Sequence, residues 1–160
     1  MKTIFFTVAD NNNLPYAKKL ENSLKRWHAD IPLKIYGQKE MDEIKDPYKF
    51  YRATPMFGRV LLEDYDLVIK IDADSVVTGD LNHIIEDESY DIGCVLNNNN
   101  LDPHVAIQGI PPSHYLNCGF VAMRSKKFVE NWWDNCNKSF FGAYPYREQD
   151  LLNILYYQRS

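Results

Sequence analysis

Near the start of the chain, the order of apolar and polar positions changes from that of a strand to that of a helix and back. Residues 4–8 are an unbroken β-branched and aromatic run, which is typical of a strand covered on both faces. Residues 14–27 carry apolar side chains every three or four positions, which predicts an amphipathic helix, and Pro15 suits its first turn. Residues 33–36 predict a second strand that ends at Gly37. The helix positions expected to face inward are Leu14, Ala17, Leu20, Leu24 and Trp27. This βαβ unit predicts an α/β fold with a largely parallel sheet.

The remainder of the chain repeats the two patterns. After a polar, irregular stretch, a helix is expected over residues 55–63 with Met56, Val60 and Leu61 facing inward. Further strands are expected over residues 66–71, 92–96 and 116–123, and further helices over residues 81–85, 125–138 and 149–157. Residues 97–114 contain an asparagine run and several prolines, which predicts a long loop, and such loops are usually functional or mobile. We expect residues 1–160 to form a single compact domain.

Composition and charge narrow the function classes. The 160 residues suit one domain, and with 45% of them hydrophobic they can bury a core. The net charge of −4 argues against a nucleic-acid partner, whose binding surface is normally basic. The three cysteines have no C-x-x-C spacing, which argues against a disulfide framework or a structural zinc site. The apolar start stops at Asp10, too early for a signal peptide. We therefore expect a cytoplasmic protein without a membrane span.

Two carboxylates follow the clearest strand. Asp72 and Asp74, separated by Ala73, stand at its carboxyl end, where open α/β sheets bind their ligands. Carboxylate oxygens that converge on one point suit Mg²⁺ or Mn²⁺, which complete their coordination with water or phosphate oxygens. An acidic turn after a strand has the same appearance, so this two-residue motif alone does not decide between a metal site and a turn.

The segment around this motif, residues 65–81, resembles the D-x-D segment of glycogenin-like, family 8-type glycosyltransferases. Three more segments resemble parts of that family in the same order. They are residues 6–17 (its first strand and nucleoside-binding loop), 115–121 (its asparagine–small–glycine strand) and 147–153 (its acidic–glutamine–aspartate stretch). The resemblance implies a GT-A, Rossmann-like catalytic core with a mostly parallel sheet flanked by helices. It also implies a metal-dependent enzyme of the retaining class, which moves a hexose from a UDP-sugar donor to a carbohydrate or glycoprotein acceptor.

The resemblance also assigns roles to individual residues. Asp72 and Asp74 would bind Mn²⁺ or Mg²⁺. The positions expected to contact the nucleotide-sugar are Thr7, Ala9, Asp10, Arg59, Asp72, Ala73, Asp74, Asn117, Cys118 and Gly119.

Gln149 and Glu148 would be catalytic. Gln149 is neutral and suits the face of the developing oxocarbenium ion. Glu148 either binds sugar hydroxyls or complements a helix dipole. For Asp150 we expect a dipole or buried contact, and for Trp132 core packing against Phe128.

Two assignments stay open. The basic residue that assists the phosphates would be Arg59 or Arg52. A third metal ligand, a histidine in the family, comes from a segment beyond residue 160. Either the ion is held by the two aspartates with phosphate and water, or the chain is a core that lacks this C-terminal segment. His104 and His114 are the loop histidines that could reach the ion.

Two other functions compete with glycosyl transfer. A haloacid-dehalogenase-type phosphatase also has D-x-D after an apolar strand, but there the motif opens the fold, whereas here a βαβ unit precedes it. A non-catalytic nucleotide-sugar-binding remnant would keep the same motifs. Release of UDP from a UDP-sugar distinguishes these functions.

Overall fold

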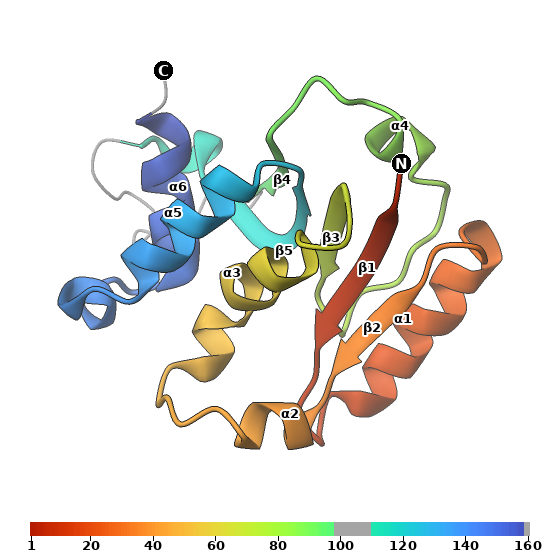
Figure 1. Cartoon of the computed structure of the whole chain (residues 1–160), viewed down its shortest axis with the longest axis horizontal. Helices are drawn as coiled ribbons and strands as arrows, with labels where there is room; N and C mark the ends of the chain where they lie inside the picture. The colour runs from red at the N-terminus through yellow and green to blue at the C-terminus, as the bar shows by residue number, and fades with distance from the viewer. Residues whose placement is uncertain (98–109, 159–160) are drawn as a thin grey trace.

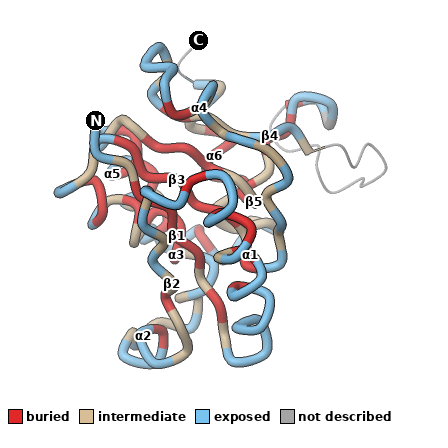
Figure 2. Tube along the Cα trace, turned by 90° about the vertical axis from the view of Figure 1, so that its right-hand side faces the viewer, coloured by how far each residue is buried: buried red, intermediate tan, exposed pale blue. Residues whose placement is uncertain are grey.

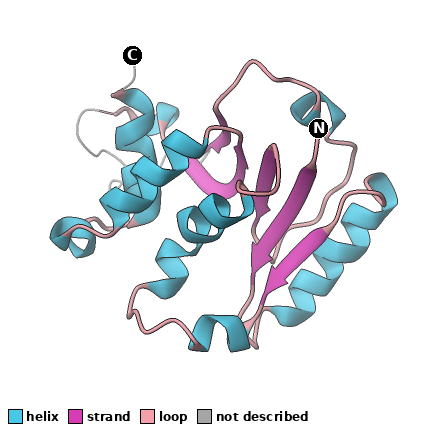
Figure 3. Ribbon diagram, viewed as in Figure 1, coloured by secondary structure: helices cyan, strands magenta, loops and turns pink. Residues whose placement is uncertain are grey.

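In the part of the chain that the computed structural model describes, residues 1–97 and 110–158, five strands form one mixed sheet with helices on both faces (Figure 1, Figure 3). The strands are β1 (Thr3–Val8), β2 (Leu33–Tyr36), β3 (Leu67–Ile71), β4 (Ile92–Leu96) and β5 (Leu116–Met123). The helices are α1 (Leu14–Trp27), α2 (Gln38–Asp42), α3 (Lys49–Leu61), α4 (Asn82–Ile85), α5 (Lys126–Cys136) and α6 (Glu148–Tyr157), with 3₁₀ turns η2 (Pro112–His114) and η3 (Ser139–Ala143).

The strand order β2-β1-β3-β5-β4 places the ends of β1 and β3 side by side. β1 is parallel to both β2 and β3, whereas β5 is antiparallel to both β3 and β4. The chain leaves β1 for β2 on one side and returns to β3 on the other, so the strand order reverses between β1 and β3. Open α/β sheets bind ligands at the carboxyl ends of the strands at such a point. The predicted α/β fold with a mostly parallel sheet is confirmed.

Helix α1 covers one face of the sheet near β1. Ala17, Leu20 and Leu24 are buried, as the helical spacing predicts. The expected inward positions at the two ends are wrong: Leu14 is 37% exposed and Trp27 is 48% exposed. The buried residues lie in the middle turns of α1, where Leu20 and Leu24 pack with Phe5 of β1 and Ile69 of β3.

Helix α3 begins earlier than the sequence predicts, at Lys49 instead of Pro55. Proline usually marks a first turn, but here it lies inside the helix. The preceding turn is held by tertiary contacts, because Arg52 forms an ion pair with Asp46 (2.6 Å) and its guanidinium stacks on Phe141.

The inward face of α3 also differs from the predicted one. Val60 is 51% exposed and Met56 is only partly buried, whereas Leu61 is buried as expected. The buried stripe contains small residues, including Gly58. A Cβ at Gly58 would lie 2.7 Å from the sulfur of Met123, so the glycine lets α3 pack closely on β5.

Helices α3, α5 and α6 together cover the opposite face, and the buried residues gather along the central strands (Figure 2). Trp132 and Phe128 of α5 lie in this core, which confirms the predicted packing role of Trp132. Ser125 begins α5 by accepting a hydrogen bond from the Phe128 amide.

The sequence led us to expect neither a disulfide framework nor a membrane span. Cys94, Cys118 and Cys136 are all free cysteines. Within residues 1–97 and 110–158, no helix has both the length and the apolar character needed to cross a bilayer.

Candidate functional site

Asp72 lies just beyond the end of β3, where β5 runs alongside. Its backbone amide donates a hydrogen bond to the carbonyl oxygen of Gly119 (2.8 Å). Its side chain is 50% exposed, and the Nζ of Lys70 donates to Oδ1. In the turn that follows, Ala73 is buried and Asp74 is exposed. The predicted pair of carboxylates is therefore at the expected end of the sheet, with one carboxylate held and the other free to reach solvent.

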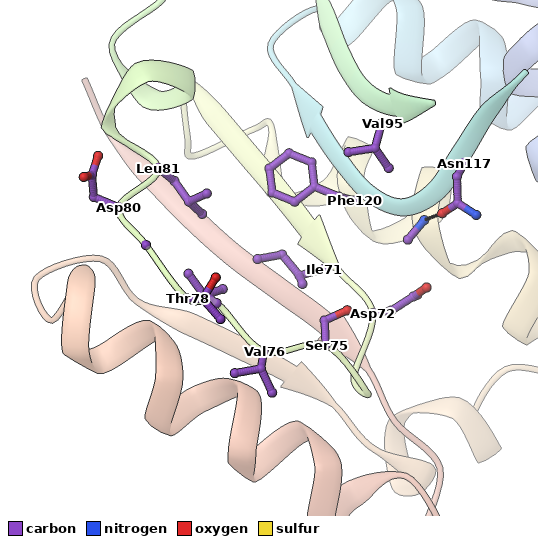
Figure 4. A pocket seen from close by; sticks show the side chains of 13 residues that line it. Ile71, Asp72, Ser75, Val76, Thr78, Asp80, Leu81, Val95, Asn117 and Phe120 are labelled. Atoms are coloured by element: carbon purple, nitrogen blue, oxygen red, sulfur yellow. Dashed lines mark hydrogen bonds between the residues drawn. The ribbon is translucent and has the colours of Figure 1, made fainter. Parts of the chain in front are cut away.

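A pocket of about 600 Å³ opens beside Asp72 (Figure 4). The end of β3, residues 75–81, β4 and β5 contribute to its lining. Figure 4 shows Asp72 and Asn117 on the same side of the pocket, away from Asp80 and Leu81. The pocket thus combines a polar side that contains the D-x-D carboxylate with apolar walls.

Gly119 makes this polar side possible. A Cβ at this position would lie 2.7 Å from Oδ1 of Asn117 and 2.9 Å from Oδ2 of Asp72. The Gly119 amide itself donates to Oδ1 of Asn117 (2.6 Å). The glycine therefore both orients the asparagine and leaves room for the carboxylate, which gives a physical reason for the asparagine–small–glycine pattern.

Glu148 is the first residue of α6, on the face of the sheet that α3, α5 and α6 cover. Burial is the main cause that raises the pKa of its carboxyl to about 8, and the charge of Asp72 adds to this while Lys70 opposes it. One of its oxygens, Oε2, is buried with no hydrogen-bond partner in the described residues. At neutral pH the carboxyl is therefore largely protonated, so it can donate a hydrogen bond and is a poor nucleophile.

The residue before Glu148 has an unusual backbone. Arg147 has a φ of 51°, in the left-handed region that costs a non-glycine residue about 1 kcal/mol or more. Its guanidinium donates to the carbonyl oxygens of Gly142 and Tyr144, which holds the conformation. The backbone direction at the start of α6 is therefore held by hydrogen bonds to residues that precede the helix.

The next polar residues of α6 bind the start of β5. Oε1 of Gln149 accepts from the Cys118 amide (2.9 Å), and Oδ1 of Asn153 accepts from the Leu116 amide (2.7 Å). Asp150 is fully buried and accepts from the hydroxyl of Tyr115. The predicted buried contact of Asp150 is thus confirmed, and these bonds hold Gln149 against β5.

Several residues predicted to contact the donor are covered or bonded within the protein, and their contacts with a nucleotide stay predictions. Thr7 is fully buried and Ala9 is 1% exposed, so their side chains offer no surface to a nucleotide. Oδ1 of Asp10 accepts from the backbone and side-chain nitrogens of Asn13 and so stabilises the turn before α1. Cys118 is buried as well, and its amide is bonded to Gln149.

The expected phosphate contact of Arg59 stays a prediction, and the structure places this residue away from the D-x-D turn. Arg59 lies in the last turn of α3, which leads to the amino end of β3, whereas Asp72 follows the carboxyl end. Its guanidinium stacks on Trp133 of α5. The sequence could not show this position of Arg59, because α3 begins earlier than predicted and runs antiparallel to β3. Arg52, the alternative, is engaged with Asp46.

The third-ligand histidines remain a prediction. His104 lies outside the described residues, as does most of the expected loop. His114 is exposed, and its Nδ1 lies 3.1 Å from the hydroxyl of Ser113. In the described part of the chain, no three His, Cys, Asp or Glu side chains converge to form a metal-binding group.

Sequence reasoning missed Lys70. Its side chain is buried and joins Asp72 to the carbonyl oxygen of Cys118 (2.8 Å). A lysine in the middle of an otherwise apolar strand was the available signal, since lysine is almost never fully buried unless its charge is paired.

Comparison with known proteins agrees with this geometry. No protein-family model matches the chain, and a search of curated proteins finds no match. Solved structures do match. The bifunctional glycosyltransferase WbbM superposes with a TM-score of 0.67 at 16% identity, over 99% of this chain and 38% of that chain. The galactosyltransferase LgtC, solved with donor and acceptor sugar analogs, gives a TM-score of 0.63 at 17% identity, over 94% of this chain and 69% of that chain. The apo form of GlyE from Streptococcus pneumoniae TIGR4 gives 0.65 at 18% identity, over 99% and 44%.

The chain has the GT-A glycosyltransferase fold. The predicted fold class is confirmed, whereas membership of family 8 stays a prediction. The chain spans less than half the length of WbbM and GlyE, and about two thirds of LgtC. In this GT-A fold, the D-x-D turn, β5 and the start of α6 are brought together from segments far apart in the sequence.

Proposed function

We propose that this chain is the donor-binding core of a metal-dependent glycosyltransferase, which moves a hexose from a UDP-sugar to a carbohydrate or glycoprotein acceptor. One observation carries the proposal. The half-exposed carboxylate of Asp72 stands at the strand-order reversal of a GT-A sheet, held by Lys70 and open to a pocket that Asn117 and Gly119 also line.

The carboxylates fit a divalent ion. Oδ2 of Asp72 has no hydrogen-bond partner among the described residues and faces the space that a side chain at Gly119 would fill, and Asp74 is exposed beside it. These are hard oxygen donors, the ligands that Mn²⁺ and Mg²⁺ prefer. Asp72 and Asp74 would hold the ion, with diphosphate oxygens and water in the other positions. When bound, it would neutralise the charge that develops on the leaving diphosphate.

The protein's own groups would orient the sugar. The amide nitrogen of Asn117 is left for a sugar hydroxyl, because its Oδ1 accepts from Gly119. Gln149 is held against β5 by its bond to Cys118, and Glu148 beside it is largely protonated at neutral pH. A neutral glutamine and a protonated carboxyl can bind hydroxyls without attacking the anomeric carbon. This arrangement is consistent with transfer from the same face of the sugar, as in the retaining class.

The acceptor would approach along the pocket of Figure 4, next to the polar side. The acceptor-binding loop expected from sequence lies largely in residues 98–109, outside the described residues, so its role stays a prediction.

The proposal is tested by release of UDP. We expect the protein to hydrolyse one or more UDP-sugars slowly in Mn²⁺ and not in EDTA, because water can replace an absent acceptor. UDP is quantified chromatographically over a panel of UDP-hexoses. UDP binding without turnover of any donor would favour the non-catalytic remnant, and hydrolysis of phosphate monoesters would favour the phosphatase.

Gly119→Ala tests the geometry of the site. The added methyl group would meet the far ends of Asn117 and Asp72, so both side chains must move while the backbone can stay. We expect UDP affinity in Mn²⁺ to fall roughly tenfold, the scale typical of displaced metal-site supports. Calorimetric titration measures this, and a circular dichroism melt checks the fold. Gly93→Ala in β4 is the matched control, because Gly93 does not line the pocket and a Cβ there would make only ordinary contacts at 3.5 Å or more. Unchanged UDP affinity in Gly119→Ala would show that Asp72 and Asn117 do not contact the donor.

A further inference from the structure

A buried ammonium group lies directly beneath the D-x-D turn. Lys70 is 7% exposed, and its Nζ donates to Oδ1 of Asp72 and to the carbonyl oxygen of Cys118. Side chains alternate along a strand, so Lys70 shares the face of Val68, which lies in the core under α3, α5 and α6. A charge in such a place costs free energy unless it is paired and hydrogen-bonded. An apolar residue would pack there at lower cost, so stability alone does not account for Lys70.

The contact divides the two oxygens of Asp72. Oδ1 accepts from Lys70, whereas Oδ2 faces Gly119 and the pocket. Asp72 can therefore offer a single oxygen to a ligand on the pocket side. Lys70 also lies close enough to Glu148 to oppose the rise in the pKa of its carboxyl, so its charge acts on Glu148 as well as on Asp72.

We propose that Lys70 is a positioning residue that restricts Asp72 to binding a divalent ion through Oδ2 alone and weakens that binding. This inference rests on the proposed function. A fixed positive charge on one oxygen of a carboxylate repels a divalent cation on the other oxygen, by roughly tenfold in affinity even at the dielectric constant of water. This repulsion acts whether or not a nucleotide is bound, and a diphosphate adds negative charge that attracts both cations.

Lys70→Met tests this with Mn²⁺ alone. The change removes the charge and keeps an unbranched side chain of similar length. We expect nucleotide-free Mn²⁺ to bind at least fivefold more tightly, as measured by the electron paramagnetic resonance signal of the free ion.

Lys126→Met is the matched control. Lys126 pairs with Glu63 (2.6 Å) on the surface, so the variant has the same change in net charge but should bind Mn²⁺ as the wild type does. If Lys70→Met does not fold, Lys70→Gln can replace it in this experiment, because the glutamine amide can still donate to the carbonyl oxygen of Cys118. Nucleotide-free Mn²⁺ affinity that is equal to or weaker than the wild-type value would overturn the proposal.

A second measurement separates this inference from the proposed function. Asp72→Asn should lower the melting temperature of the wild type, because it removes the negative charge that pairs with the buried Lys70 ammonium, and should change that of Lys70→Met much less. This coupling needs neither metal nor nucleotide. If wild-type protein binds Mn²⁺ and UDP and releases UDP from donors, but the melting effects of the two substitutions simply add, the role of Lys70 fails alone. If the coupling is present but no UDP-sugar is bound, the proposed function fails instead.

Discussion

Asp74→Asn is expected to weaken Mn²⁺-dependent UDP binding on the order of 100-fold while leaving the melting temperature unchanged. The proposed ion has two protein ligands, and this change removes the charge and one strong donor. Asp74 is exposed and makes no side-chain hydrogen bond or ion pair with a described residue, so its loss should not affect folding. Calorimetric titration of UDP in Mn²⁺ and in EDTA measures the effect. Asp72→Asn would be less clean, because it also removes the negative charge that pairs with the buried Lys70 ammonium.

The control for Asp74→Asn is Asp64→Asn. Asp64 is exposed before the amino end of β3, so the variant carries the same charge change away from the site. Its affinity for UDP should equal that of the wild type. Equal UDP affinity in Mn²⁺ and in EDTA for the wild-type protein would remove the metal from the proposal.

Glu148→Gln is expected to stabilise the protein at alkaline pH and much less at acidic pH. Burial raises the pKa of Glu148 from 4.5 to about 8, so the native state holds a proton that the unfolded chain releases. The stability contributed by the protonated form is fully present below about pH 4.5 and is lost as pH rises through about 8. The free energy of unfolding of the wild type should thus fall by roughly 2–4 kcal/mol between pH 5 and pH 8 from this group alone.

Urea unfolding at pH 5, 7 and 8 tests the role of Glu148. The difference in unfolding free energy between Glu148→Gln and the wild type should grow with pH in favour of the variant. Burial also raises the pKa of Asp150, but that contribution is common to both proteins and cancels. Glu88→Gln, at an exposed position, should leave the pH dependence as it is. A difference that stays constant from pH 5 to pH 8 would mean that Glu148 is solvated in the native state.

The strands of this protein could be predicted closely, because their side-chain pattern is decided by burial on a sheet. Residues 92–96 and 116–123 were expected as strands and are β4 and β5. Helix α3 was harder, since Pro55 looks like a start signal. Its additional turn depends on Asp46 and Phe141, which contact Arg52 only in the folded protein.

The sequence by itself determined the α/β class and the place of the D-x-D turn, because both follow from local periodicity and from the chain order of strands. Its motifs also named Asn117 and Gly119, which the structure places beside Asp72. Only the tertiary structure decided which basic residue contacts Asp72. Arg59 and Lys70 both precede Asp72 in the chain. Helix α3 places Arg59 near the amino end of β3, whereas the alternation of side chains along β3 places Lys70 beneath the carboxylate of Asp72. That choice depends on contacts between distant segments, above all the carbonyl oxygen of Cys118 on β5, and no local pattern contains them.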